Sequence, residues 1–460
     1  MMTGSFTALS GKESGVKRKL HKLSFKGFSR ENEAGKLRVK CENCEIADGN
    51  VYPAFALKNA TVTNKGVFPA KSGTTFLRVA FPAETADGVK YEDAIAVAED
   101  YSVYRYNYNT YAYERLSGIS LTCAPAAIKY CFDEKEERAV LFGGQAVSVR
   151  PGGKVDVLAE TCYKNFGCAA SERIFFAADG KSLKYSGVLA MDDYAESADE
   201  GGRISFAADS EIRGICALGK YVYVFFAREI YRVAAQGAAR DFTAEKVPYG
   251  GGEIAEGSPA SCGNVICFLT GEGVYAFDGS AAKNVTQNRG ELVFSNLAVW
   301  YCAGAAGRYV CEFGSSDAST QSIVYNTRNG AVTQTDLSLK TACAYGNEIY
   351  VYSGGEKKFA FDRSVELTRS YGVSRLNEPF LHRGLKTLRR VKIYGKGSVR
   401  LAFAASASSV GTTYALVLAE NGTELQFNVT AKEFSFTLFL GNKAFVSGVD
   451  VEYSAFDRGR

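Results

Sequence analysis

The clearest structural signal in the chain is Ile174-Phe175-Phe176-Ala177-Ala178-Asp179-Gly180-Lys181-Ser182-Leu183-Lys184-Tyr185. Apolar and aromatic residues typical of strands flank the dipeptide Asp179-Gly180. Asp-Gly is favoured in tight type I′ turns, because both central residues of that turn have positive φ. The stretch therefore predicts a β-hairpin.

Hairpins of this kind recur along the middle of the chain. Their first strands begin near residues 94, 139, 174, 221, 265, 308 and 348, so successive starts lie 35 to 47 residues apart. That spacing is typical of β-propeller blades, which bury both faces of each small sheet by stacking radially. We predict an all-β fold with a propeller of about seven blades, within a range of six to eight, over residues 25–370. A large multi-sheet sandwich with coincidental spacing is the alternative.

The two ends of the chain follow different patterns. Short alternating runs lie close together in residues 371–460, joined by turns such as Asn421-Gly422. They predict a small antiparallel C-terminal β domain. Residues 1–24 show little apolar periodicity and predict a flexible basic N-terminal arm.

Positive charge gathers in two segments. The chain has 54 Lys and Arg against 50 Asp and Glu, yet residues 1–40 hold ten basic residues against three acidic ones, and residues 363–400 hold ten against two. This asymmetry fits contact with a polyanion or an acidic partner. The alternative is a solvated surface plus a flexible arm. The candidate contact residues are Lys17, Arg18, Lys19, Arg383, Lys386, Arg389, Arg390 and Lys392.

Strand alternation makes a more detailed prediction for the second basic segment. It places Lys392 on the same face as Arg390, with Val391 and Ile393 on the other face. One face of this strand would then line a charged channel or meet an acidic partner.

Signals for metal or cofactor chemistry are weak. Of the 12 cysteines, only Cys41 and Cys44 have C-x-x-C spacing, and a zinc site usually needs a second pair. Most of the other cysteines lie in apolar runs and are interpreted as reduced core residues. No phosphate-binding loop, dinucleotide fingerprint or His-Glu-x-x-His occurs, and the two histidines stand far apart. We therefore assign no catalytic, metal or cofactor residue and expect no enzyme.

Targeting signals give a similar result. No apolar run approaches the roughly 18 residues of a membrane span. The start of the chain lacks the apolar core of a secretory signal, so neither a membrane location nor secretion is expected.

The middle of the chain resembles virion propeller proteins of tailed phages. The resemblance rests on residues 215–225, 229–233 and 257–261, and on the strand Gly273-Val274-Tyr275-Ala276-Phe277-Asp278-Gly279. Residues 25–30 with 48–53 look like the opening of the same group, and residues 388–394 are similar to its C-terminal β region. The nearest named family is the packaged-DNA stabilisation, or head-to-tail completion, proteins of short-tailed phages. The many cysteines are a departure from that group.

This resemblance implies a non-enzymatic structural role. Copies would form a homo-oligomeric ring below the portal, seal the exit and dock the next tail part. The implied partners are portal, adaptor or tail subunits, with nonspecific contact with DNA. The implied location is the virion, assembled in the host cytoplasm. It carries over no catalytic residue.

Two other functions stay open. A carbohydrate-binding or glycoside-hydrolysing propeller used in host recognition could stack sugars on aromatic residues at its mouth, or the same residues could pack between blades. The candidates are Tyr101, Tyr104, Tyr106, Tyr108, Tyr111 and Tyr113. The third function is a generic bacterial scaffold.

Overall fold

The computed structural model describes residues 7–9, 16–23, 38–42, 44–47, 50–53, 55–56, 61–63, 66–68, 74–84, 90–98, 100–107, 112–132, 136–195, 200–287, 297–305, 307–315, 318–334, 343–345, 348–352, 356–360, 373–378, 385–405, 412–419, 421–431, 434–440 and 444–456. In this part of the chain the regular structure is β-strand, apart from one short 3-10 helix, Ala239–Asp241. None of the helical structure described here has the length and apolar character needed to span a membrane.

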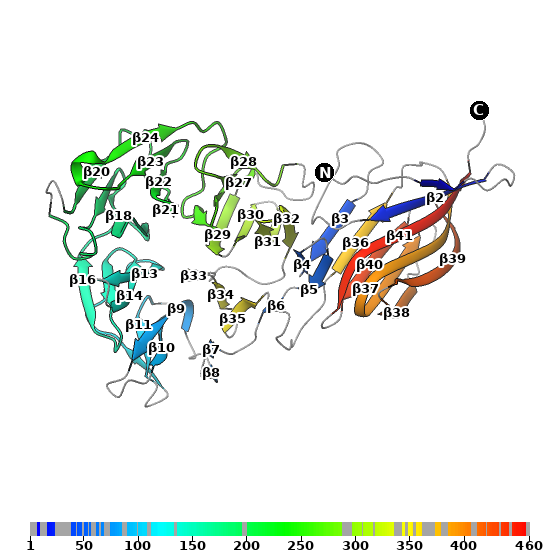
Figure 1. Ribbon diagram of the computed structural model, residues 1–460, viewed down its shortest axis with the longest axis horizontal. Coiled ribbons are helices and arrows are strands. Elements are labelled where there is room, and N and C mark those ends of the chain that lie inside the picture. The colour runs from blue at the N-terminus through cyan, green and yellow to red at the C-terminus, as the bar shows by residue number, and fades with distance from the viewer. Residues whose placement is uncertain are drawn as a thin grey trace.

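Seven groups of four antiparallel strands follow one another around a ring, and we number them as blades 1 to 7 (Figure 1). Blade 1 consists of β9 (Thr74–Glu84), β10 (Lys90–Ala98), β11 (Val103–Asn107) and β12 (Ala112–Arg115), and blade 2 of β13 (Ala126–Phe132), β14 (Glu136–Phe142), β15 (Ala146–Val149) and β16 (Val155–Ala159). Blade 3 consists of β17 (Gly167–Ala170), β18 (Arg173–Asp179), β19 (Ser182–Tyr185) and β20 (Gly202–Ser205). Blade 4 consists of β21 (Gly214–Leu218), β22 (Tyr221–Phe225), β23 (Ile230–Ala234) and β24 (Thr243–Val247).

Blade 5 consists of β25 (Ala260–Ser261), β26 (Ile266–Thr270), β27 (Gly273–Phe277) and β28 (Ala282–Asn284). Blade 6 consists of β29 (Leu297–Ala305), β30 (Arg308–Ser315), β31 (Ala318–Asn326) and β32 (Ala331–Gln334). Blade 7 consists of β33 (Cys343–Tyr345), β34 (Glu348–Tyr352) and β35 (Glu356–Ala360), and β6 (Phe55–Ala56) completes it.

The ring closes on itself. The first strand of each of blades 2 to 6 contacts the first strand of the next blade, and β9 of blade 1 contacts both β14 of blade 2 and β33 of blade 7. Blade 7 takes its outermost strand from the other end of the propeller sequence, because β6 pairs antiparallel with β35. This shared blade fastens the two ends of the ring together.

Alternation along the second strand of each blade explains how the blades stack. In β18, Ile174 and Phe176 pack in one cluster with Phe142 of blade 2. Phe175 lies in another cluster with Val224 of blade 4. Successive strand residues point to opposite faces, so a fully apolar run buries both faces of a blade that has neighbours on both sides. The same arrangement joins blades 1 and 2, 4 and 5, 5 and 6, and 6 and 7.

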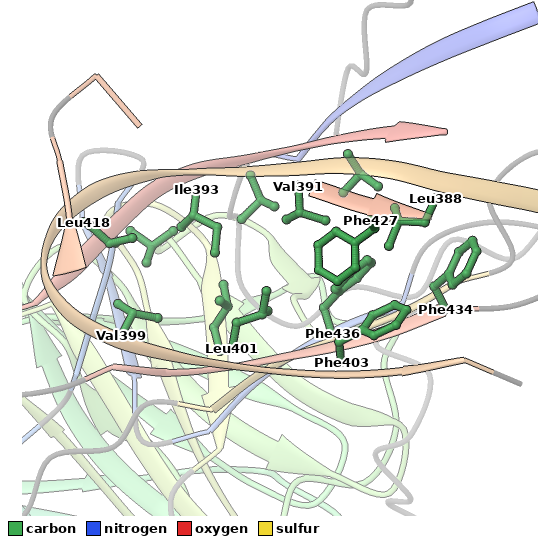
Figure 2. Packing of buried hydrophobic residues seen from close by; sticks show 14 of the residues in the cluster. Leu388, Val391, Ile393, Val399, Leu401, Phe403, Leu418, Phe427, Phe434 and Phe436 are labelled. Carbon is green, nitrogen blue, oxygen red and sulfur yellow. The ribbon is translucent and has the colours of Figure 1, made fainter. Parts of the chain in front are cut away.

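The C-terminal β domain is built around one long strand, β37 (Lys386–Ala405). Its first half pairs with β39 (Thr423–Ala431) and β41 (Phe445–Phe456), whereas its second half pairs with β38 (Thr412–Leu418) and β40 (Phe434–Leu440). The strand bends between these halves at Gly395 and Gly397, both of which have positive φ. The bend folds the sheet over on itself, and Figure 2 shows β37 curving around the apolar side chains that it encloses.

The core of this domain lies between the two halves of the folded sheet. Figure 2 shows Leu388, Val391 and Ile393 from the first half facing Leu401 and Phe403 from the second. All are buried, and burying each such side chain contributes roughly 1.5–3 kcal/mol. The prediction of a propeller followed by a small antiparallel β domain is confirmed.

The N-terminal segment differs from the expected domain boundaries. Strand β2 (Val16–Leu23) pairs with β41 and with β1 (Thr7–Leu9), so both described stretches of the expected flexible arm over residues 1–24 belong to a sheet. Strand β3 (Arg38–Glu42) pairs with β36 (Val373–Glu378) and meets β32 at one residue, although residue 25 was the expected start of the propeller. The cause is pairing with distant strands, which local sequence does not reveal.

Four short strands complete the described N-terminal part. Strand β4 (Cys44–Ala47) pairs with β5 (Asn50–Pro53), which also meets β41. Strands β7 (Thr61–Thr63) and β8 (Gly66–Phe68) pair with each other. We therefore revise the boundaries: strands β1 to β5 lie with the C-terminal domain, and the first strand of the propeller is β6.

Candidate polyanion-binding or partner-binding face

The basic face of the C-terminal domain carries Arg389, Arg390 and Lys392, and its arrangement depends on an irregularity in β37. The register of β37 against both of its neighbours shifts between Leu388 and Arg390, which marks a β-bulge at Arg389. Beyond the bulge the predicted alternation is confirmed, because Val391 and Ile393 are fully buried whereas Lys392 is partly exposed. A bulge re-aims the side chains next to it, and here Arg389 and Arg390 both reach polar groups of the flanking strands.

Arg389 has neutral partners. Its Nη1 donates to Asn428 Oδ1 of β39 at 2.8 Å, and its Nε donates to Ser454 Oγ of β41 at 3.3 Å. These bonds hold the guanidinium in place without cancelling its charge.

Arg390 lies between two carboxylates. Its Nη1 is 3.3 Å from Glu424 Oε2 of β39, and its Nη2 is 2.9 Å from Glu452 Oε2 of β41. The arginine side chain is 36% exposed, so the pairs are partly screened by water. Its charge is therefore balanced within the protein, in contrast to that of Arg389.

Lys392 lies beside an aromatic ring. Its Nζ is 5.0 Å from the centre of the Tyr394 ring, within the range of a cation–π contact. The Tyr394 hydroxyl donates to Asp450 Oδ2 at 2.9 Å. Burial first, and then this hydrogen bond, raise the pKa of Tyr394 above its usual value, so the ring stays neutral at physiological pH.

The two basic segments of the sequence come together in one sheet. Strand β41 lies between β2 and β37, and the backbone register places Lys17, Arg18 and Lys19 opposite Ala455, Ser454 and Tyr453. No sign of this proximity is found in the sequence, because β2 and β37 do not pair with each other. Each pairs with β41, which lies far from β2 along the chain. Arg383 lies outside the described residues, as do the side chains of Lys386 and of β2.

Sequence reasoning missed the acidic residues of this face. Glu424, Asp450 and Glu452 come from β39 and β41, and they contact Arg390 or Tyr394. The described part of the face thus holds three cationic and three anionic side chains. Strand register decides these neighbours, and it follows from the turns and bulges of the whole sheet.

A buried arginine in the propeller also escaped prediction. Arg173 is 1% exposed, and its Nη1 donates to the carbonyl oxygens of Ser186 and Glu200, each at 2.7 Å. Its guanidinium lies 5.3 Å from the centre of the Phe242 ring of blade 4. It lines a hollow of about 570 Å³ between blades 3 and 4. These contacts fasten the loops of two neighbouring blades, which is a structural role.

The remaining candidate groups are described only in part, because Tyr108 and Tyr111 lie outside the described residues, as do the side chains of Tyr106, Cys41 and Cys44. Tyr104 and Tyr113 lie on the two outermost strands of blade 1, away from the inner strands that surround the axis. Cys41 and Cys44 belong to β3 and β4. Among the side chains that the structure describes, no group of three or more His, Cys, Asp or Glu is placed to hold a metal ion.

No known family model matches the chain, and no curated protein matches it either. Among solved structures, BBS1N in complex with ARL6DN, soaked with lead, has a TM-score of 0.40 and 10% identity, covering 67% of this chain and 98% of that one. The mitotic checkpoint complex has a TM-score of 0.38 and 10% identity, covering 66% and 93%. A Mycobacterium tuberculosis puromycin-hydrolyzing peptidase has a TM-score of 0.36 and 10% identity, covering 81% of this chain and 58% of that one.

Proposed function

We propose that the protein is a non-enzymatic structural component of a phage virion, either a head-to-tail connector or a tail-associated propeller. The observation that supports this role is the joining of a seven-bladed propeller and a β domain by the same N-terminal segment. Strands β1 to β5 lie with the C-terminal domain, and β6 completes blade 7. A body of this kind offers two separate surfaces to different neighbours, as a connector requires.

The propeller sequence supports the same role. The pattern Gly273–Gly279, on which the phage resemblance rests, falls on β27 and its following turn in blade 5. The partners we propose are portal, adaptor or tail subunits, with a ring of copies around the DNA exit. The proposed location is the virion, after assembly in the host cytoplasm.

Binding to purified virion subunits tests this function directly. The protein would be mixed with portal and tail subunits of the same phage and measured by native mass spectrometry. We expect a complex that contains several copies of this chain. A chain that stays monomeric and unbound with every one of these subunits would contradict the proposal.

The DNA contact can be tested by comparing two adjacent arginines. Because Arg389 keeps its charge whereas Arg390 is balanced by two glutamates, Arg389→Gln should weaken nonspecific DNA binding more than Arg390→Gln. Removing one phosphate interaction should make the plot of log K against log salt shallower by about one in slope. Arg232→Gln on blade 4, which removes an arginine paired with Glu245, is the matched control. Equal affinities for all four proteins would rule out a DNA contact at this face.

A further inference from the structure

Two cysteines of blade 6 lie directly opposite each other on neighbouring strands. Cys302 of β29 is the register partner of Cys311 of β30. The two strands are joined through only two residues, and Ala305 and Arg308 flank that connection as partners. Such a short turn is flanked by a hydrogen-bonded pair, and hydrogen-bonded and non-hydrogen-bonded pairs then alternate along the two strands. Counting back from the turn, Cys302 and Cys311 form a non-hydrogen-bonded pair.

A pair of this kind has the spacing that a disulfide needs. Its Cα atoms are about 4.5 Å apart, and its side chains lie on the same face of the sheet. Disulfides join residues whose Cα atoms are about 4.4–6.8 Å apart. The packing agrees with the register, because both side chains belong to the apolar cluster between blades 5 and 6. The backbone therefore holds the two sulfur atoms within reach of a covalent bond.

The two thiols differ in their exposure. Cys311 is fully buried, whereas Cys302 is half-buried. Burial first, and then a hydrogen bond with Cys302, raise the pKa of Cys311 well above its usual value. Cys311 is thus shielded from a solute, and Cys302 is the thiol of the pair that a small oxidant can reach.

The other cysteines of this cluster lack the arrangement. Cys267 of β26 lies opposite Ala260 and Ala276 in its sheet. Cys262 is a neighbour of Cys267 in blade 5, but the two are not register partners. Both are buried, so a solute reaches neither of them as easily as it reaches Cys302.

We propose that Cys302 and Cys311 form a redox modification site, which closes to a disulfide when hydrogen peroxide reaches Cys302. The Cys302 sulfur attacks the O–O bond and takes up one oxygen as sulfenic acid, while the other oxygen leaves as water with the thiol proton. The Cys311 sulfur then displaces the sulfenic hydroxyl, which leaves as a second water with the Cys311 proton. Each sulfur loses one electron overall, and the peroxide gains both. The inference rests on this hairpin and is independent of the virion role.

Peptide mapping identifies the bond directly, because Arg308 lies between the two cysteines in the sequence. The folded full-length chain would be treated with hydrogen peroxide, its remaining thiols blocked with a maleimide, and the protein cleaved with trypsin without reduction. Trypsin leaves Cys302 in residues 290–308 and Cys311 in residues 309–328, and neither peptide contains another cysteine.

We expect these two peptides to be joined, with a mass that is lower than their sum by two hydrogen atoms. Dithiothreitol should separate them and restore both thiols. The joined pair should be at least about tenfold more abundant than any other pair of cysteine peptides, because the fold fixes which thiol lies beside Cys302.

Two variants separate this site from general oxidation of the core. Cys302→Ala should abolish the cross-link and leave Cys311 as a thiol. Cys267→Ala is the matched control, because it removes a thiol of the same cluster, and it should form the Cys302–Cys311 bond like the unmodified protein. Circular dichroism would check folding. If Cys302→Ala does not fold, unmodified protein unfolded in urea gives the comparison, since Cys302 should then pair with several cysteines.

Four results would overturn the inference. The first is a folded protein without the joined peptides at a peroxide concentration that oxidises the exposed Cys131. The second is Cys302 recovered as sulfinic or sulfonic acid while Cys311 stays a thiol. The third is the same mixture of cysteine pairs in folded and unfolded protein, and the fourth is loss of the bond in Cys267→Ala.

Discussion

Replacing Gly395 with alanine should destabilise the C-terminal domain selectively. Gly395 lies where β37 bends from one half of the folded sheet to the other, with φ at +152°. A methyl group at this position would lie 2.0 Å from the carbonyl oxygen of Phe445 and 3.0 Å from Val446 Cα. Both neighbours are backbone atoms of β41, which cannot rotate away as a side chain can.

The cost has two parts. Positive φ in a residue with a Cβ costs roughly 1–2 kcal/mol. The steric conflict forces β41 to move by about 1 Å or more, and overpacking of this kind costs roughly 1–3 kcal/mol. The total of about 2–5 kcal/mol raises the opening equilibrium of the domain by at least about 30-fold.

Hydrogen exchange followed by mass spectrometry measures this effect locally. Peptides from residues 386–405 and 445–456 should exchange at least about 30-fold faster, whereas peptides from blades 3 to 5 should keep their rates. Gly219→Ala is the control, because Gly219 has φ at +59° but open space around it. It should show the backbone cost alone, within its own blade. Unchanged exchange in residues 386–405 would refute the argument that contact with β41 requires glycine here.

Three further predictions concern the propeller. Ser258→Ala should lower the free energy of unfolding in urea by about 1–3 kcal/mol. The buried Ser258 Oγ accepts a hydrogen bond from the Leu269 N–H at 3.1 Å, and the substitution leaves that donor without this partner. A loss of stability no greater than that of Ser280→Ala, on the surface, would contradict this prediction. The backbone N–H groups of Ala281 and Ser280 lower the pKa of Asp278, so its stabilising effect is complete above its ordinary pKa of 3.8 and disappears as pH falls through the lowered value. Asp278→Asn should therefore lose less stability than the unmodified protein as the pH falls below 4. Identical acid-unfolding curves for the two proteins would contradict a lowered pKa of Asp278. Burial raises the pKa of Cys168 to about 12 and that of Cys162 to about 11, whereas Cys131 is exposed. Peptide mapping after brief maleimide treatment should therefore find Cys131 modified first and Cys168 only after unfolding; equal rates would show that blade 3 opens freely.

The propeller could be predicted from sequence because its main signal is local. The run Ile174–Ala177 is apolar at every position, and the structure shows that both of its faces are buried between blades. A tight turn at Asp179-Gly180 and a second strand follow directly, so each blade carries most of its own pattern. Period and turn chemistry are sufficient for a repeating unit of this kind.

The C-terminal face was less predictable, because its neighbours come from distant parts of the chain. Alternation correctly placed Val391 and Ile393 on the buried face, but the bulge at Arg389 cannot be seen in a run of basic residues. Whether Arg390 meets a carboxylate depends on the register of β41, more than fifty residues later in the sequence. The role of Val16–Leu23 as a strand depends on the same distant partner, since a strand with little apolar pattern is stabilised by the sheet that it joins.

The order of the strands along the chain explains how the C-terminal domain acquires these partners. Pairing β3 with β36 joins residues more than three hundred positions apart, and such a long loop would carry a large entropic cost if it were a free coil. The propeller removes most of that cost, because closure of the ring pairs Phe55 with Ala360. Residues 38–53 and 373–378 then emerge from neighbouring strands of the same blade and are already close together. Ring closure in the propeller therefore prepares the N-terminal strands to extend a domain whose own sequence begins only after the last blade.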